Sequence, residues 1–194
     1  RDTKDLVGSY ERLLDAFAYW SFGEGGVQGE LRLGRQVASW GESTFIQGGI
    51  NAINPIDVSA LRVPGAELRD ALLPVGAAFL SLKPSENTAL EVYYQYDWEE
   101  TKIDPVGSYF STTDLAGGGA EKVLLGFGSA PDTIPVGARI PGNPVGAVVP
   151  RGATREADES NQYGAAFRWF VPALGGTDFG FYYMKYNSRL PVIM

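Results

Sequence analysis

The side chains that most enzymes use for nucleophilic and acid–base chemistry are missing from this sequence. It contains no histidine and no cysteine, which excludes the Ser-His-Asp triad, thiol nucleophiles and the usual zinc ligand sets. It also lacks the G-x-S-x-G, Walker and G-x-G-x-x-G motifs. We therefore predict that the chain is not an enzyme, and we expect no catalytic residues, no metal and no cofactor.

Carboxylates are the remaining candidates for acid–base or metal chemistry. Glu42, Glu99 and Glu100 fall in predicted loops, where no element fixes their separation, so we interpret them as solvated loop charges. Three aspartates further along the chain do not have the spacing of an EF-hand loop, and we predict no calcium site at Asp104, Asp114 and Asp132.

Composition excludes further classes of function. Sixteen Lys and Arg against 23 Asp and Glu give a net charge of −7, whereas nucleic-acid-binding proteins usually carry a basic face. The 194 residues are 44% hydrophobic, which suits one folded domain rather than a disordered chain. No apolar run approaches the ~20 residues of a membrane-spanning helix. We therefore expect no nucleic-acid partner and no helical membrane span.

Alternation of apolar and polar residues with a period of two dominates the chain and predicts an all-β fold. Three short turns at 23–26, 84–87 and 172–176 contain the Gly, Asn or Pro residues that hairpins use. They predict about six antiparallel strands, arranged as three hairpins, at 12–22, 27–38, 76–82, 88–98, 163–170 and 177–186.

Two long links, 39–75 and 100–161, alternate with these short turns, as in an up-and-down transmembrane β-barrel. The twelve residues 27–38, with a rise of ~3.4 Å each, span roughly 40 Å. A tilt of ~45° leaves about 28 Å, close to the ~25 Å apolar band of outer-membrane barrels. Since closure takes ~8 strands or more, we predict that residues 1–194 form a single partial β-barrel domain of a longer chain.

The 39–75 link is predicted to contain short helical turns. Asn54-Pro55 has the residue types of a helix N-cap and first helical position, and a second turn is expected over 66–73. Such turns need a surface to bury against, so we predict that the link enters the lumen as a constriction. It would contribute the charges of Asp57, Arg62, Glu67, Arg69 and Asp70. A capping loop whose charges pair with one another is the alternative.

The 100–161 link holds half of the prolines and the Gly117-Gly118-Gly119 run. We interpret it as a long Gly/Pro-rich surface loop with a short strand over 122–127.

The polar rows of the strands are expected to face the lumen, because Arg or Lys facing lipid costs ~2–4 kcal/mol at the bilayer midplane. Their signs are mixed, so a polar passage and internal ion pairs both remain open. The lumen-lining candidates are Glu30, Arg32, Glu91, Gln95, Asp97 and Arg168.

Four tryptophans flank the predicted strand ends. Trp20 and Trp169 lie beside short turns, and Trp40 and Trp98 lie beside the long links. Indole favours the headgroup region of a bilayer, so we predict that they are interfacial aromatics. Ordinary core aromatics are the alternative.

Several segments are distinctive: LRLGRQV at 31–37, SWGESTFI at 39–46, GINAINP at 49–55, LRVPGAELR at 61–69, YFST at 109–112, VPRG at 149–152, YYM at 182–184 and SRLP at 188–191. Together they resemble the bacterial domain-of-unknown-function 1302 family. The resemblance implies a barrel in the outer membrane of a Gram-negative bacterium, and this chain resembles an internal fragment of a longer member. Such proteins are often encoded near a second exported family and an RND-type exporter, which implies traffic of lipid or hydrophobic compounds. The resemblance supplies no catalytic residues.

Three functions follow as expectations. The first is an outer-membrane barrel that passes or hands over a small, hydrophobic or lipid-like solute. Its partners would be outer-membrane lipid, the rest of its own barrel chain, and a periplasmic partner or exporter. The second is a plugged structural or docking outer-membrane protein that binds a partner through its long loops. The third is a soluble β-sandwich that binds carbohydrate through its aromatics.

Overall fold

The computed structural model describes residues 13–23, 26–40, 49–111, 115–125, 131, 133–138, 142 and 148–192. Glu42, Asp114 and Asp132, considered above, lie outside these residues. The chain divides into two compact units, one containing Lys102–Glu156 and the other formed by Leu13–Thr101 with Ala157–Met194. Each unit is described by itself.

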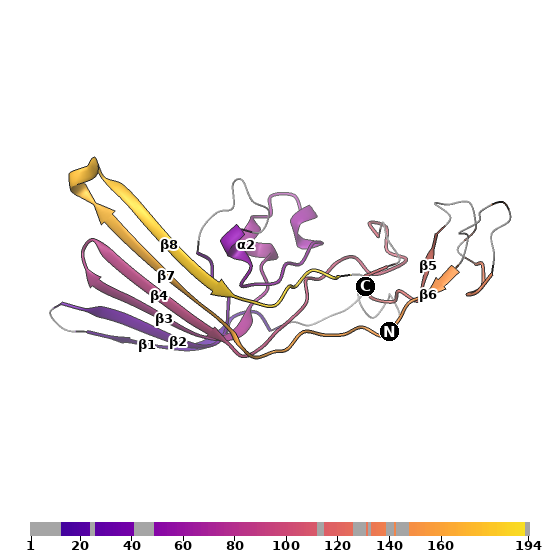
Figure 1. The fold of residues 1–194 in the computed structure, drawn as a ribbon, viewed down its shortest axis with the longest axis horizontal. Coiled ribbons are helices and arrows are strands. Elements are labelled where there is room, and N and C mark those ends of the chain that lie inside the picture. Colours follow the sequence, from indigo (N-terminus) through magenta and orange to yellow (C-terminus); the bar gives the residue numbers. More distant parts are fainter. Residues whose placement is uncertain are drawn as a thin grey trace. The chain divides into compact units, whose positions relative to one another are not determined.

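Among the described residues, the second unit contains one six-stranded antiparallel sheet with the order β1-β2-β3-β4-β7-β8. Every strand pairs with its neighbours in sequence within that sheet (Figure 1). This confirms the all-β, antiparallel prediction. The strands are β1 Ala16–Phe22, β2 Gln28–Gln36, β3 Val75–Ser85, β4 Thr88–Gln95, β7 Gln162–Val171 and β8 Thr177–Lys185.

The observed strand bounds differ from the predicted ones at one or both ends: β1 and β4 are shorter by several residues, β7 differs by a residue at each end and β8 by a residue at its end, and β2 and β3 differ as follows. β3 has 11 residues and continues to Ser85, past an irregularity in its pairing with β4 between Leu82 and Ser85. The Gly76-Ala77-Ala78 segment carries little alternation, so its strand character depends on pairing with β2. β2 has nine residues rather than twelve and ends at Gln36.

The pairing register brings the alternating rows of the strands together on two faces. Arg32, Phe79, Tyr93, Gly164 and Met184 are successive register partners on one face. The residues that precede or follow them occupy the opposite face: Leu31, Leu80, Val92, Ala165 and Tyr183. We call the first the loop-side face, because the 49–74 loop packs on it, and the second the apolar face.

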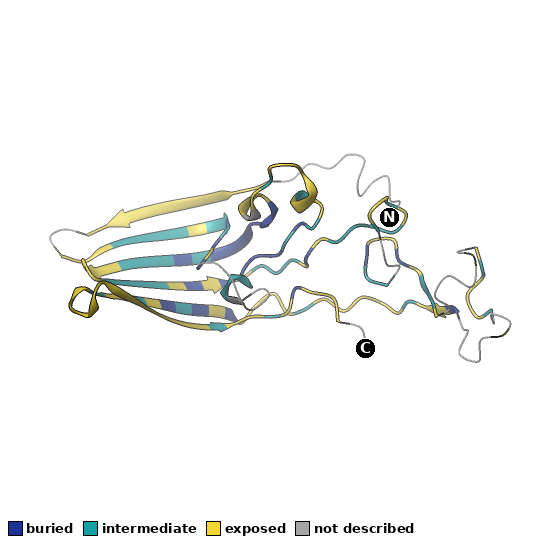
Figure 2. Ribbon diagram, turned by 90° about the horizontal axis from the view of Figure 1, so that it is seen from above, coloured by how far each residue is buried: buried dark blue, intermediate teal, exposed yellow. Residues whose placement is uncertain are grey.

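The apolar face has exposed side chains in β1, β2, β4, β7 and β8, whereas Ala78, Leu80 and Leu82 of β3 are half-buried. Trp20 is 67% exposed and Tyr183 is 62% exposed, and no described element of this unit packs on the face. Burial is instead concentrated at the end of the strands remote from the hairpin turns (Figure 2). Other exposed side chains of the face are Leu33, Val92, Tyr94, Phe167, Trp169 and Phe181.

The 49–74 loop contains the 3-10 turns η1 Gly49–Asn51 and η2 Ala60–Arg62 and the short helix α2 Leu68–Ala71. α2 lies within the predicted 66–73 turn and begins with a capping box between Glu67 and Asp70. The sheet also has a 3-10 turn, η3 Pro172–Leu174, between β7 and β8. No helix in the described parts of the chain is long and apolar enough to cross a membrane.

The prediction that Asn54 caps a helix is wrong. Asn54 is buried, and its amide binds backbone groups of distant residues. The helical turn that follows Asn54 is η2, and the carboxylate of Asp57 accepts hydrogen bonds from the amides of Ser59 and Ala60 at its start. A capping rule considers only neighbouring residues, so it cannot predict that the Asn54 side chain binds residues far away in sequence.

The Lys102–Glu156 unit contains a small hairpin of β5 Lys122–Leu124 and β6 Val148–Pro150. β5 confirms the first half of the short strand predicted over 122–127. Arg151, just after β6, binds the segment that precedes β5. Its Nε donates to the Leu115 carbonyl at 3.2 Å and its backbone amide donates to the Glu121 carbonyl at 2.8 Å.

Candidate functional site

The candidate site is the loop-side face with the 49–74 loop packed against it. A small buried core joins the two: it contains Ile53 of the loop, Ala38 and Trp40 after β2, and Phe79, Tyr93 and Ala166 of the sheet. Ile50 and Met184 pack against this core. In Figure 1 the loop containing α2 lies toward the end of the sheet remote from the hairpin turns.

Trp40 is the largest side chain in this core and is only 1% exposed. Its ring lies 5.2 Å from that of Tyr93 and 6.1 Å from that of Tyr182, measured between centroids. Gly164 makes room for this packing. A Cβ there would lie 2.6 Å from Cε1 of Tyr93 and 2.9 Å from Cη2 of Trp40, which is closer than van der Waals contact allows.

Asn54 ties the two ends of the loop together. Its Nδ2 donates to the carbonyls of Leu73 at 2.8 Å and Gln36 at 3.3 Å, and its Oδ1 accepts from the Ala38 amide at 2.9 Å. These bonds satisfy backbone groups that would otherwise be buried without partners.

Arg189, which follows β8, ties the loop to the far part of the sheet. Its Nε donates to the carbonyl of Ala52 in the loop at 3.1 Å. Its Nη1 donates to the Glu99 carbonyl at 3.1 Å and its Nη2 to Oε1 of Gln95 at 2.8 Å. Burial lowers the pKa of Arg189 to about 10, and Tyr93, Asp97 and Glu99 partly oppose this effect. The guanidinium is therefore still charged at neutral pH.

Five of the six lumen-lining candidates lie on the loop-side face. Arg32 pairs with Glu30 at 3.4 Å and stacks over the ring of Phe79 at 4.6 Å. Nη2 of Arg168 donates to the Trp40 carbonyl at 3.1 Å. Gln95 is fully buried beside Arg189, and Glu91 shares the face through its register with Ser81 and Ala166. The face therefore carries both ion pairs and aromatic rings.

Asp97 lies elsewhere, because β4 ends at Gln95 and the alternation stops with it. Its carboxylate accepts from Nη1 of Arg35 at 3.1 Å and from the Gly76 amide at 3.3 Å. Arg35 also pairs with Glu99 and donates to the Pro74 carbonyl. The one charge that interrupts the apolar row of β2 is thus neutralised at the strand end.

The constriction candidates make their observed bonds within the loop. Glu67 pairs with Arg69 at 2.9 Å, and Oδ2 of Asp70 accepts from the Glu67 amide at 2.9 Å. Asp57 is buried and bonded to Ser59, and Arg62 is exposed. The loop packs on the sheet through Ile53 and its neighbours, as a constriction requires. Within the loop, Glu67 and Arg69 pair with each other, as the capping alternative requires, whereas Asp57 and Asp70 bind uncharged groups of the loop.

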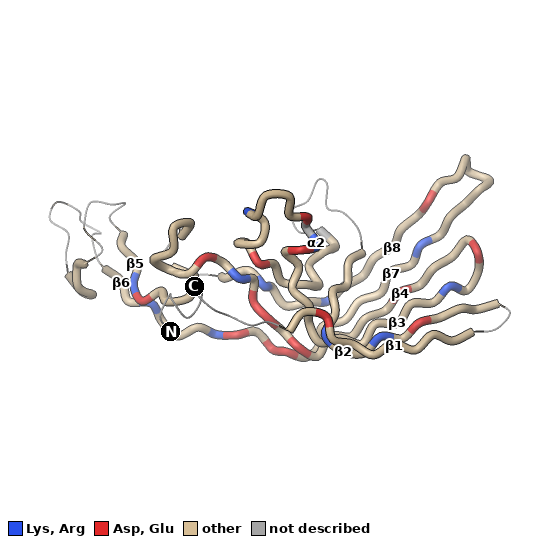
Figure 3. Tube along the Cα trace, turned by 180° about the vertical axis from the view of Figure 1, so that it is seen from behind, with Lys and Arg blue, Asp and Glu red and all other residues tan. Residues whose placement is uncertain are grey.

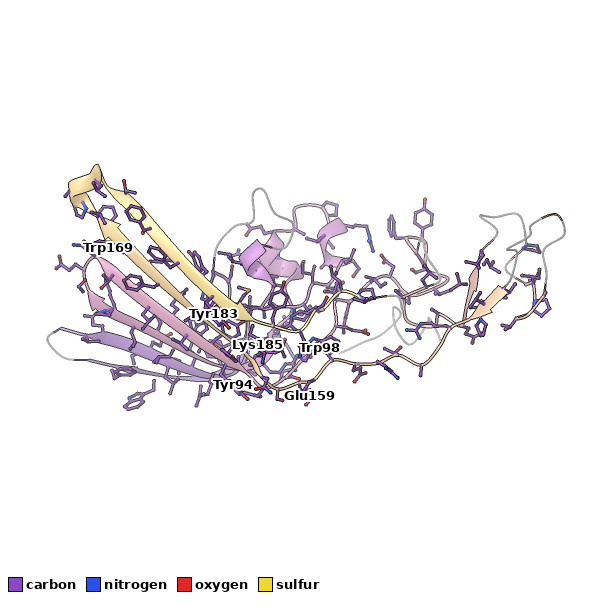
Figure 4. The ribbon with its side chains drawn as sticks, in the orientation of Figure 1. Tyr94, Trp98, Glu159, Trp169, Tyr183 and Lys185 are labelled. Carbon is purple, nitrogen blue, oxygen red and sulfur yellow. The ribbon has the colours of Figure 1, made fainter. Side chains whose placement is uncertain are left out.

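The four tryptophans occupy different environments. Trp20 and Trp169 are exposed on the apolar face near the hairpin turns, whereas Trp40 is buried on the loop-side face and Trp98 is half-buried after β4. Trp40 is therefore not placed to meet a membrane interface. Tyrosines take the loop end of the apolar face instead: Figure 4 shows Trp169 near the turns and Tyr94, Tyr183 and Lys185 toward the other end.

The turn end of the loop-side face is open. A hollow of about 730 Å³ lies at the turn end of β1, β2 and β3 and is lined by residues of both faces. Figure 3 shows isolated charged positions along these strands. The lining residues are Trp20, Ser21, Phe22, Gly23, Gln28, Gly29, Glu30, Ser81 and Lys83.

Sequence reasoning missed two residues that hold the site together, Asn54 and Arg189. Both fall inside segments that carry the family resemblance, GINAINP and SRLP, but nothing in a linear pattern indicates that a residue after the last strand contacts a loop 137 positions earlier.

The comparison with protein families decides the relationship of the chain. A family described as a protein of unknown function, DUF1302, matches residues 1–194, the whole chain. The chain belongs to the DUF1302 family. This confirms the resemblance drawn from the sequence motifs. No curated protein and no solved structure matches this DUF1302 chain.

Proposed function

We propose that this DUF1302 chain forms part of the wall of a β-barrel in the outer membrane of a Gram-negative bacterium. The barrel would pass or hand over a small, hydrophobic or lipid-like solute. One observation carries the proposal: an apolar face, exposed in five strands and half-buried in β3, runs over all six strands, opposite a face that holds most of the charged strand residues. Lipid on one side and an aqueous interior on the other would suit these two faces.

The distribution of aromatics supports the same placement. Near the turns the apolar face carries two ring pairs, Trp20 with Phe22 and Trp169 with Phe179, and near the loop end it carries Tyr163 with Tyr183. Aliphatic residues such as Leu31, Leu80 and Val92 lie between them. Two aromatic girdles around an aliphatic band are typical of outer-membrane barrels.

The strand lengths fit such a band. The nine residues of β8, with a rise of ~3.4 Å each, span about 30 Å. A tilt of ~40° reduces this to roughly 23 Å, near the ~25 Å apolar band. Lys185, on the apolar face, is the last residue of β8, where a cation would reach the headgroup level.

The edges of the sheet support a longer barrel. β1 and β8 are its outer strands, and within the described residues neither pairs with a further strand. Unpaired edges invite uncontrolled pairing. We propose that the rest of the protein's own chain pairs with both. Since short turns of such barrels face the periplasm, a periplasmic partner or exporter would meet the hairpin turns.

A plugged structural or docking protein is the second candidate. The 49–74 loop favours it, because Ile53, Asn54 and Arg189 fasten the loop to the face that would line the bore. The soluble β-sandwich is less favoured, since a sandwich buries one face of each sheet against the other and the apolar face here is exposed.

Membrane fractionation and gel mobility test the proposal. The full-length protein should be recovered in the outer-membrane fraction and should migrate differently before and after boiling, because a folded barrel resists detergent. Recovery in the aqueous fraction would contradict the barrel.

Conductance across a planar bilayer separates the first two candidates. A passage predicts discrete current steps from the full-length protein. A membrane-inserted protein that carries no current under any applied potential would favour the plugged scaffold.

A further inference from the structure

Arg189 connects the 49–74 loop to the ends of β4 and β8. Its three hydrogen bonds end on three separate segments: Ala52 in the 49–74 loop, Gln95 at the end of β4, and Glu99 beyond it. Its own carbonyl accepts from the Thr101 amide at 2.9 Å. The side chain is buried, with the residue 6% exposed. A rigid, planar guanidinium fork suits such a junction, because its donors are held in a fixed geometry.

Asn54 plays a different part, since all of its partners are residues at the two roots of the loop: Gln36, Ala38 and Leu73. Those bonds hold residue 54 beside the end of β2 and the end of the loop, and they do not reach β4 or β8. Arg189 joins the loop to the ends of β4 and β8, so its bond to Ala52 breaks in any movement of the loop away from those strands.

The contact that Arg189 reinforces is incompletely satisfied. Nε1 of Trp40, the hydroxyl of Tyr93 and Oε1 of Gln36 are buried without a hydrogen-bond partner, as is Nε of Arg168. Buried polar atoms without partners oppose the packed arrangement. A small apolar core and a few hydrogen bonds therefore hold the docked loop. The unpaired buried atoms oppose docking, because water could bind them once the loop left the sheet.

We propose that Arg189 is a positioning residue that latches the 49–74 loop against the loop-side face and thereby keeps the passage narrow. The inference rests on the proposed function, because it assigns the loop to the bore of the barrel. Releasing the latch lets the loop swing on its roots, exposes the Trp40–Tyr93 core and widens the passage.

Thiol accessibility tests the latch without any assumption about transport. The described chain has no cysteine, so I53C in the full-length protein reports on a loop residue that is 1% exposed. Maleimide labelling of the peptide containing position 53, measured by mass spectrometry, should be slow in the I53C protein. It should accelerate by about tenfold or more in I53C/R189Q, because hydrogen bonds to a charged group are lost. R189K should fall between the two, and the exposed control R155Q should match the parent.

Conductance provides the second readout. R189Q should raise the current per channel several-fold, with the boiling-dependent gel shift retained. In I56C/T101C/R189Q, oxidation should join the loop to the segment after β4, since the Ile56 amide lies 3.5 Å from Oγ1 of Thr101. Oxidation of this variant should lower the current per channel to that of the parent, and reduction should raise it again.

Each outcome decides a separate point. Unchanged labelling in R189Q, with the barrel intact, would overturn the latch. Faster labelling without current in any variant would support the latch and contradict the passage. If R189Q loses the gel shift, Q95L removes one acceptor of the fork while preserving bulk, and unchanged labelling in that variant would overturn the proposal.

Discussion

Gly164 is the residue at which the sheet accommodates the buried aromatic pair of the site. Tyr93 and Trp40 approach its Cα from the loop-side face, and the Tyr183 carbonyl lies 2.7 Å from where a Cβ would stand. Glycine in a strand interior is ordinarily unfavourable, so the packing of two large rings is the compensation here.

The G164A variant should lower the free energy of unfolding by ~1–3 kcal/mol, the usual cost of overpacking a core. Urea unfolding of the full-length protein in detergent, followed by tryptophan fluorescence, measures it. The control is G152A, where no atom lies within 4 Å of the added methyl group. Equal stability of G164A and the parent would show that the Trp40–Tyr93 packing is not tight.

Asn54 carries the second prediction at this scale. N54A leaves the Ala38 amide and the carbonyls of Gln36 and Leu73 without the bonds that Asn54 supplies. Each buried group left unpaired costs ~1–3 kcal/mol, so the same unfolding experiment should show a loss of about 3 kcal/mol. S39A removes the exposed bond between Ser39 and Asn51, and it should change stability by less than ~0.5 kcal/mol. If N54A lost as little unfolding free energy as S39A, the role of Asn54 in joining the two ends of the loop would be contradicted.

The elements of the sheet were largely predictable, and the reason is physical. Alternation located β1, β2, β4, β7 and β8, because one face of each strand is apolar and the side-chain period of a strand is two. The length of β3 was underestimated at its end, since Pro84 and Ser85 fall in the turn predicted at 84–87 but continue the strand. Contacts between segments far apart in sequence, such as Asn54 with Leu73 and Arg189 with Ala52, leave no periodic trace, so the hydrogen bonds that hold the loop required the structure.

Adjacent positions of β3 offer a matched test of the two faces. Leu80 lies on the apolar face and Ser81 on the loop-side face. L80K should cost ~2–4 kcal/mol if that face meets lipid and should reduce the amount of heat-modifiable protein in the outer membrane. S81K should leave that amount near the parent's, because water would solvate the ammonium group. Equal tolerance of both changes would contradict the assignment of the faces.

At the scale of the whole molecule, the described sheet is an up-and-down series in which each strand pairs with the strands that precede and follow it within the sheet, although the β5-β6 unit separates β4 from β7 in sequence. One hairpin can therefore be duplicated or deleted without rethreading the chain. In the proposed barrel, each such event would change the circumference by two strand spacings, about 10 Å, and leave every remaining pairing in place. The width of the proposed barrel would then be set in steps by the number of copies of the same hairpin unit.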